Sequence, residues 1–286
     1  APASAVAWPW AVGAQEPGGG APRLFQHGVA SGDPLTDRVI LWTRVTTPAT
    51  RSAIGPVDVS WQIAEDETLT RIVARGQAAA APERDFTVKV DAGGLRPGRT
   101  YFYAFDAGGQ RSPVGRTRTF ADQGIDRLRL AVVSCSNYAA GYFNAYRGIA
   151  NRADLDAVLH LGDYIYEIAD GIFEDTESTG RAPLPLGVAS TLDEYRLRYA
   201  IYRSDPDLQD AHRLHPFIVV WDDHEIANNA WAGGADDHSA KQGDWGTRLA
   251  AAYRAYREWL PVRESPDREI RLYRSFRAGD LADLMM

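Results

Sequence analysis

The chain has 286 residues, of which 45% are hydrophobic and 24% are charged, and its formal net charge is -7. This length and apolar content suffice for two hydrophobic cores, and no apolar stretch is long enough to span a membrane. The acidic balance disfavours a nucleic-acid-binding protein, because such proteins concentrate lysine and arginine to neutralise phosphates. A single cysteine, Cys135, excludes an intrachain disulfide and leaves the compartment open on that ground.

Residues 1–22 predict the remnant of a signal peptide followed by a linker. Residues 1–15 are rich in alanine and other small residues, and residues 17–22 consist of proline, glycine and alanine. No basic region precedes the small residues, so the start of such a peptide is not seen in this sequence.

Residues 23–121 predict a β-sandwich of the fibronectin or immunoglobulin-like kind. Segments 57–63, 86–90 and 100–105 alternate apolar with polar or aromatic residues, and glycine pairs punctuate them. Residues 95–101 resemble the turn of fibronectin-type domains in which a tyrosine packs back over the loop. We expect this domain to be a scaffold without a ligand of its own.

Residues 122–286 predict the first part of an α/β sandwich. Three short apolar runs, 128–133, 157–161 and 217–221, have the composition of strands buried on both faces of a sheet. Residues 142–149 have helical spacing, Thr191 and Glu194 form a capping box, and residues 246–260 form an amphipathic helix that Pro261 ends. Strands that alternate with helices indicate a mostly parallel sheet, whose ligands gather at the carboxyl ends of the strands.

Each apolar run is followed by side chains that can bind metal ions. The segments are Ser134-Cys135-Ser136, Gly162-Asp163-Tyr164-Ile165-Tyr166 and Trp221-Asp222-Asp223-His224-Glu225. A carboxylate such as Asp163 can bridge two cations, and Asp223 and His224 add oxygen and imidazole donors. A thiolate from Cys135 and a phenolate from Tyr166 would favour iron, whereas carboxylates suit calcium, magnesium or manganese. The segments therefore predict two unlike metals.

The three segments, in this order and with Gly-Asp-x-x-Tyr intact, resemble the calcineurin-like metallophosphoesterases. Cysteine in place of the usual first aspartate, and Trp-Asp-Asp-His-Glu in place of Gly-Asn-His-Glu, resemble the alkaline phosphatase D (PhoD-like) family. Residues 27–34 and 39–44 resemble the opening of the N-terminal domain of that family, and residues 276–283 resemble a strand region in its catalytic domain.

This resemblance implies that Cys135, Asp163 and Tyr166 hold Fe(3+), that Asp163 and Asp223 hold Ca(2+) or another divalent ion, and that His224 faces the phosphate. The implied enzyme is a metal-dependent phosphoric ester hydrolase, with Asp223 and His224 as its catalytic residues. A cation pair lowers the pKa of a bound water, and the hydroxide so formed attacks a phosphomonoester or phosphodiester in line. No residue of the chain is expected to act as a covalent nucleophile.

One segment of the family pattern is missing. Members of the family continue to a Gly-Asp-x-His segment that completes the metal sites, and none of the six histidines here follows Gly-Asp. We expect a second polypeptide or a missing C-terminal segment to complete the site, because residues 280–286 break off inside an apolar run, as in a truncated or nicked chain. The resemblance also implies export to the periplasm or medium, often by the twin-arginine route.

Several polar residues have plainer interpretations. Asp222 is expected to orient His224 or a bound water, and residues 228–243 are expected to form a mobile loop over the site. Structural roles are expected for His160, His212 and His215. His238 is expected to lie in an acidic solvated loop rather than at the rim of the site, and Arg147, Asn228 and Asn229 could reach substrate. Two other functions stay open: a phospholipase D-type phosphodiesterase on the same centre, and a non-catalytic exported binding protein whose β-sandwich is the working part.

Overall fold

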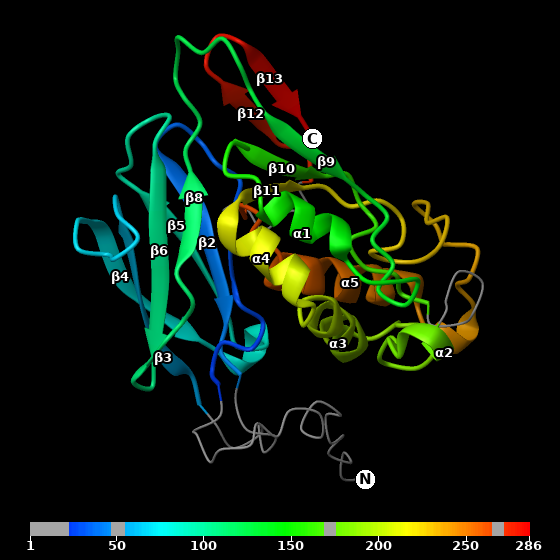
Figure 1. Ribbon diagram of the computed structural model, residues 1–286. Coiled ribbons are helices and arrows are strands. Elements are labelled where there is room, and N and C mark those ends of the chain that lie inside the picture. The colour runs from blue at the N-terminus through cyan, green and yellow to red at the C-terminus, as the bar shows by residue number, and fades with distance from the viewer. Residues whose placement is uncertain (1–22, 47–54, 169–175, 265–271) are drawn as a thin grey trace.

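The computed structural model describes residues 23–46, 55–168, 176–264 and 272–286. These ranges form a larger sheet with helices on one of its faces, a smaller sheet and a C-terminal hairpin (Figure 1). The predicted signal-peptide remnant and linker at residues 1–22 lie outside the described residues. In the described ranges we find no helix with the length and apolarity needed to cross a bilayer.

The larger sheet carries the strands that precede the candidate ligands. In spatial order its strands are β5 (Thr87–Gly93), β2 (Arg38–Arg44), β1 (Val29–Gly32), β11 (Pro216–Val219), β10 (Ala157–His160) and β9 (Leu130–Val133). Strands β9, β10 and β11 pair in parallel, with Val158 opposite both Ala131 and Phe217. This confirms that the three apolar runs form neighbouring parallel strands, and it brings their carboxyl ends to one edge, although β2 pairs antiparallel with both β1 and β5 in the same sheet.

The pairing of β1 with β11 joins the two halves of the chain. The strands run parallel, and Ser31 and Gly32 lie opposite Pro216 and Phe217. Strands from the N-terminal segment and strands from the following segment therefore belong to one hydrogen-bonded sheet. The sequence does not reveal this pairing, because the contact spans only a few residues and joins segments far apart in the chain.

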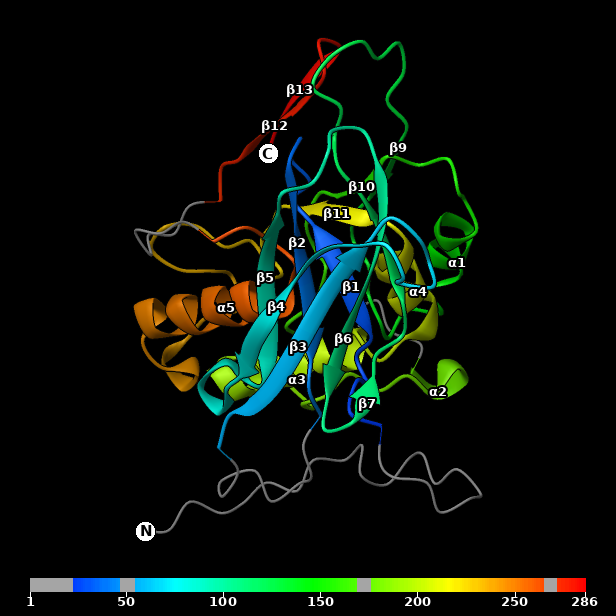
Figure 2. The same ribbon diagram turned by 90° about the vertical axis from the view of Figure 1, so that its left-hand side faces the viewer.

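The smaller sheet packs against the β1, β2 and β5 side of the larger one. Figure 2 looks onto it, with strands of the larger sheet behind. Apolar side chains of both sheets, such as Leu41 and Ile63, share one core. Its strands are β4 (Ile72–Ala80), β3 (Val57–Ala64), β6 (Thr100–Ala107) and β7 (Gln110–Arg111), with β8 (Gly115–Arg118) also paired to β6.

The fibronectin-like turn is present at residues 95–101. The Tyr101 hydroxyl accepts a hydrogen bond from the Arg96 amide at 2.8 Å, so the tyrosine packs back over its loop as expected. The immunoglobulin-like topology and the division of the chain at residues 121 and 122 stay predictions.

The helices cover the face of the larger sheet opposite to the C-terminal hairpin. Tyrosines of α3, among them Tyr195 and Tyr199, pack with Phe217 of β11 and Trp42 of β2 in the largest core cluster. The helices are α1 (Asn144–Ala150), α2 (Thr176–Thr179), α3 (Leu192–Tyr202), α4 (Pro206–Leu214) and α5 (Trp245–Trp259), and short 3-10 turns occupy Pro82–Arg84 and Ala240–Gln242. Helix α5 matches the predicted helix at 246–260 to within one residue.

The predicted capping box opens α3. The Thr191 hydroxyl accepts a hydrogen bond from the Glu194 amide at 3.4 Å, and the Glu194 carboxylate accepts one from the Thr191 amide at 2.9 Å. Two backbone N–H groups that lack partners within the helix are thereby satisfied. The helix start was predictable because its signal is local.

The C-terminal hairpin lies on the other face of the larger sheet. It consists of β12 (Ser275–Ala278) and β13 (Ala282–Met285), and Phe276 packs against Leu159 and Ile218. The strand region expected at residues 276–283 is thus a two-stranded hairpin.

Three of the histidines are buried and structural, as expected. The Tyr164 hydroxyl lies 2.9 Å from His212, the Tyr146 hydroxyl lies 3.1 Å from His160, and His215 donates to the Ile149 carbonyl at 3.0 Å. Burial lowers the pKa of His160 to about 3 and that of His215 to about 4. Because the unfolded chain takes up these protons near pH 6.5, acid should destabilise the fold.

Replacing His215 with glutamine should flatten this pH dependence. Between about pH 6.5 and 4 the unfolded wild type holds a proton on His215 that the folded protein does not. Its free energy of unfolding should therefore fall as the pH falls, by about 1.4 kcal/mol per pH unit from this residue alone. Glutamine can still donate to Ile149 but does not titrate, so its curve should lack this slope. Urea unfolding at pH 7.5 and 5.0 measures the difference, and parallel curves for the two proteins would contradict the assignment.

Candidate metal centre

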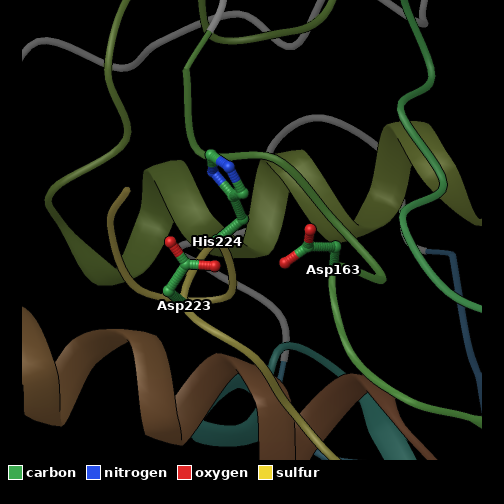
Figure 3. A group of neighbouring side chains, drawn as sticks. All are labelled: Asp163, Asp223 and His224. Atoms are coloured by element: carbon green, nitrogen blue, oxygen red, sulfur yellow. The ribbon is translucent and has the colours of Figure 1, made fainter. Parts of the chain in front are cut away.

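The loops that follow β9, β10 and β11 bring the candidate ligands to one edge of the sheet. Asp163, Asp223 and His224 each offer a ligand atom, and these atoms lie within 4.8 Å of one another. Figure 3 shows the carboxyl group of Asp163 facing that of Asp223, with His224 beside them. Three of the five predicted site residues are therefore close enough to share an ion.

The backbone at this edge is held in uncommon conformations. Cys135 and Asp163 have φ values of 56° and 51°, in the left-handed region that few residues other than glycine adopt. Gly162 precedes Asp163, and a Cβ atom there would lie 2.4 Å from the Asp222 amide nitrogen. Only glycine permits this close approach of the two loops. Such strain is common at functional sites, where the surrounding structure maintains it.

Asp163 has the surroundings of a cation ligand. Its side chain is buried, its Oδ2 accepts a hydrogen bond from the Tyr166 hydroxyl at 3.1 Å, and its Oδ1 is buried without a hydrogen-bond partner. Burial raises the pKa of this carboxyl group, and Asp223 adds to that shift. A buried carboxylate oxygen without a donor is costly, and a cation would supply the missing interaction. The donor set therefore fits a metal ion.

Cys135 lies near Asp163 but outside the close group of three, whereas Tyr166 contacts Asp163 directly through its hydroxyl. The Cys135 thiol is exposed, and the Cys135 backbone amide donates to the Gly162 carbonyl at 3.1 Å, next to Asp163. Burial and the neighbouring Asp163 raise the pKa of Tyr166 above its ordinary value. The phenol therefore keeps its proton and donates a hydrogen bond to Asp163. Deprotonation to a phenolate would require a nearby cation.

Glu225 ties the second and third loops together, a role that the sequence did not suggest. Its fully buried carboxylate accepts hydrogen bonds from the amides of Asp163 at 3.2 Å, Tyr164 at 2.5 Å and Asp222 at 2.8 Å. Burial raises the pKa of Glu225 to about 8, and the amide donors oppose that shift. This one side chain fixes the distance between Asp163 and the loop that carries Asp223.

Glu167 orients His224. This role of Glu167 was not predicted from the sequence. The fully buried Glu167 carboxylate accepts from His224 Nδ1 at 2.7 Å and from the Asn228 amide at 2.6 Å. Burial alone would lower the pKa of His224, but Glu167, Asp163 and Asp223 raise it to about 9. Asp222 was expected to orient His224 or a bound water; the His224 ring instead contacts Glu167, and the alternative with a bound water stays a prediction. Glu167 lies one residue past the Gly-Asp-x-x-Tyr segment, and that position was the only signal.

The remaining polar candidates divide between the site and the scaffold. The Asn229 amide donates to the Asp223 carboxylate, and its side chain donates to Asp236 at 2.7 Å, so this loop is tied to the site. Arg147 forms a bidentate ion pair with Asp207 at 2.8 Å, which assigns it to the scaffold.

Replacing Glu167 with glutamine should impair turnover while metal binding is retained. The amide keeps the size of the carboxylate, but it no longer supplies the negative charge that orients and stabilises the His224 ring. Outer-shell changes of this kind cost roughly 10–100-fold in activity. Steady-state kinetics and metal content of the variant measure the effect, with Glu194→Gln at the start of α3 as a matched control. Unchanged kcat in Glu167→Gln would refute the role.

Comparison with protein families identifies the family to which the chain belongs. Residues 130–286 match the PhoD-like phosphatase family, and residues 13–121 match the N-terminal domain of PhoD-like phosphatases. The chain therefore belongs to the PhoD-like phosphatase family, as its three polar segments suggested.

Two relatives agree with this assignment. Alkaline phosphatase D of Bacillus subtilis (strain 168) is 40% identical over 268 residues, which are 90% of this chain and 45% of the relative. A solved structure of PhoD is 38% identical with a TM-score of 0.83, over 93% of this chain and 52% of that one. The chain thus spans about half the length of these relatives.

Proposed function

We propose that this chain contributes to a metal-dependent hydrolase of phosphate esters, of the alkaline phosphatase D type. The observation that carries the proposal is the close group of Asp163, Asp223 and His224 at the carboxyl ends of β10 and β11. Membership of a phosphatase family supports the same reaction class. We propose Cys135, Asp163 and Tyr166 as ligands of Fe(3+), and Asp163 and Asp223 as ligands of Ca(2+) or another divalent ion.

The bound cations would activate the attacking water and neutralise charge on the phosphoryl oxygens. The protein side chains position the reactants. Glu167 engages His224 through Nδ1, which leaves Nε2 to donate a hydrogen bond to a phosphoryl oxygen or to the leaving group. Asp223 is held by the Asn229 amide, so its carboxylate is fixed relative to Asp163. Substrate would then bind at the strand ends.

The rest of the family site is proposed to come from outside residues 1–286. The curated relative is about twice as long as the segment it shares with this chain, and the missing Gly-Asp-x-His segment would lie there, in the same or in a second polypeptide. The intact mass of the purified protein shows whether another chain is present. Export, by the twin-arginine route, is proposed from the family resemblance alone, and cell fractionation tests it.

The proposal is tested by metal content and substrate range together. We expect iron and calcium in the purified protein, a visible absorption band from thiolate or phenolate bound to Fe(3+), and hydrolysis of 4-nitrophenyl phosphate or of its bis-ester. Preferential release of choline from phosphatidylcholine would favour the phospholipase D-type enzyme instead. A colourless, metal-free and inactive protein would refute the proposal and favour a binding protein.

A further inference from the structure

A second polar site lies at the opposite edge of the larger sheet. A cavity of about 300 Å³ opens where the turn before β5, strand β5 itself and the segment after α5 meet. Its apolar lining comes from β2, β4 and β5, and its charged lining consists of Arg84, Lys89, Asp91, Arg263 and Glu264. We call these ten lining residues, including the apolar ones, the β5 pocket.

Basic side chains in and around the β5 pocket surround one carboxylate. Glu264 Oε1 lies 2.5 Å from Arg84 Nη2 and 2.9 Å from Lys89 Nζ, and its Oε2 lies 2.7 Å from Arg257 Nη2. Burial alone would raise the pKa of Glu264, but Lys89 and Arg84 lower it to about 2. The pocket already holds one carboxylate of the chain in the way that a protein holds a bound anion.

The β5 pocket keeps a positive excess after its internal pairing. Asp91 pairs with Arg263 and lies 3.7 Å from Arg38, which is itself bonded to Asp37. Three cations of the pocket, Arg84, Lys89 and Arg263, and the adjacent Arg257 face two carboxylates, Asp91 and Glu264, which leaves about two positive charges in and beside the pocket. This local excess occurs in a chain whose formal net charge is -7. A site of this charge attracts a dianion.

Two donors of the pocket are poorly satisfied. Arg263 Nε is buried and has no hydrogen-bond partner among the described residues. Lys89, whose side chain is only 9% exposed, donates to the Arg257 carbonyl and to Glu264, which leaves its third N–H group available. Burial lowers the pKa of Lys89 to about 8, and Arg84 and Arg257 contribute to that shift. Both donors would gain from an additional acceptor.

Capping of α5 explains only part of this arrangement. Lys89 donates to a carbonyl in the last turn of α5, where a cation is favourable. Arg84 and Arg263 donate to Glu264, Asp91 and the Asp33 carbonyl, none of which lies in α5. Helix capping therefore does not explain why Arg84 and Arg263 line the same cavity as Lys89.

We propose that the β5 pocket binds a tetrahedral dianion, namely phosphate, either free or as the terminal group of a small ester. A phosphate dianion would neutralise the two excess charges and accept hydrogen bonds from Arg263 and Lys89, and arginine is well suited to such oxyanions. The site is separate from the metal centre. Strand β5 is three positions from β11 and four from β10 in the sheet, which corresponds to about 14–19 Å at the usual strand spacing.

The test measures phosphate binding with the metal centre disabled. In a chelator-treated Asp163→Asn protein, calorimetric titration with inorganic phosphate should show one site. Lys89→Met should weaken phosphate binding at least 10-fold. Arg84→Gln should also weaken phosphate binding, and because Arg84 is more exposed than Lys89, this change should leave the core undisturbed. Lys241→Met is the matched control, because Lys241 is an exposed lysine that does not line the β5 pocket. Lys89 and Lys241 are the only lysines in the sequence.

The lysine pair also gives a readout that does not depend on calorimetry. Phosphate should protect Lys89 from acetylation by a small reagent, measured by peptide mass spectrometry, while Lys241 reacts at an unchanged rate. Chloride at equal ionic strength should not protect Lys89, and glycerol phosphate added in place of phosphate shows whether an ester is accepted. Absence of phosphate binding in Asp163→Asn, or loss of binding in Lys241→Met but not in Lys89→Met, would overturn the proposal. Neither outcome depends on whether the protein hydrolyses phosphate esters.

Discussion

Replacing Asp163 with asparagine is expected to abolish both metal binding and turnover. Asp163 lies at the centre of the close group and has a buried oxygen without a partner. The loss should exceed the roughly 10–100-fold that an outer-shell partner contributes, because a shared ligand is removed. Elemental analysis and assay of 4-nitrophenyl phosphate hydrolysis measure the two effects.

Asparagine is a better choice than alanine at this position. Asp163 has a φ of 51°, and asparagine tolerates the left-handed region, whereas alanine would add roughly 1 kcal/mol of strain. Asp33 offers a matched control, since it is fully buried with a φ of 42° and pairs with Arg274. Asp33→Asn should lose stability but keep its metal. Full metal content in Asp163→Asn would refute the proposed centre.

Replacing Glu225 with alanine is expected to cause the largest loss of stability. Three amide N–H groups in two loops donate to this buried carboxylate, and truncation would leave all of them unsatisfied. The expected decrease in the free energy of unfolding is about 3–5 kcal/mol, because each buried N–H group left without an acceptor costs roughly 1–3 kcal/mol. The loops after β10 and β11 would also separate, so the affinity for metal should fall.

Chemical denaturation of Glu225→Ala and of Glu225→Gln separates the effect of losing both acceptor oxygens from the effect of losing one. Glutamine retains one acceptor oxygen but directs an NH2 group at backbone donors. The free energy of unfolding of Glu225→Gln should therefore lie between those of Glu225→Ala and the wild type. A decrease below about 1 kcal/mol for alanine would contradict the role assigned to Glu225, because a single lost hydrogen bond could explain it.

Local signals in the sequence predicted the elements that carry the site. The apolar runs before Cys135, Asp163 and Asp223 are short, mutually parallel strands of one mixed sheet, and the capping box at Thr191 opens a helix as expected. These predictions succeed because strand burial, helix capping and turn chemistry depend on residues within a few positions of one another. The segments that hold the ligands could therefore be named from the sequence.

The sequence could not predict how the polar side chains pair across the loops. Glu167 and Glu225 each bond to residues 57 to 62 positions away, and nothing in their local sequence distinguishes them from surface glutamates. The separation of Cys135 from the close group likewise depends on backbone angles that residue types do not determine. Which carboxylate supports which ligand is a tertiary property.

The parallel contact between β1 and β11 has a consequence for dissecting this protein. A chain excised to begin after residue 121 would lack β1, and the flank of β11 would become an open template for other strands. Such a fragment should self-associate and fold poorly even with every metal-binding side chain intact. Residues 23–121 thus give structural support to the sheet edge that carries the candidate ligands, and expression trials should keep them attached.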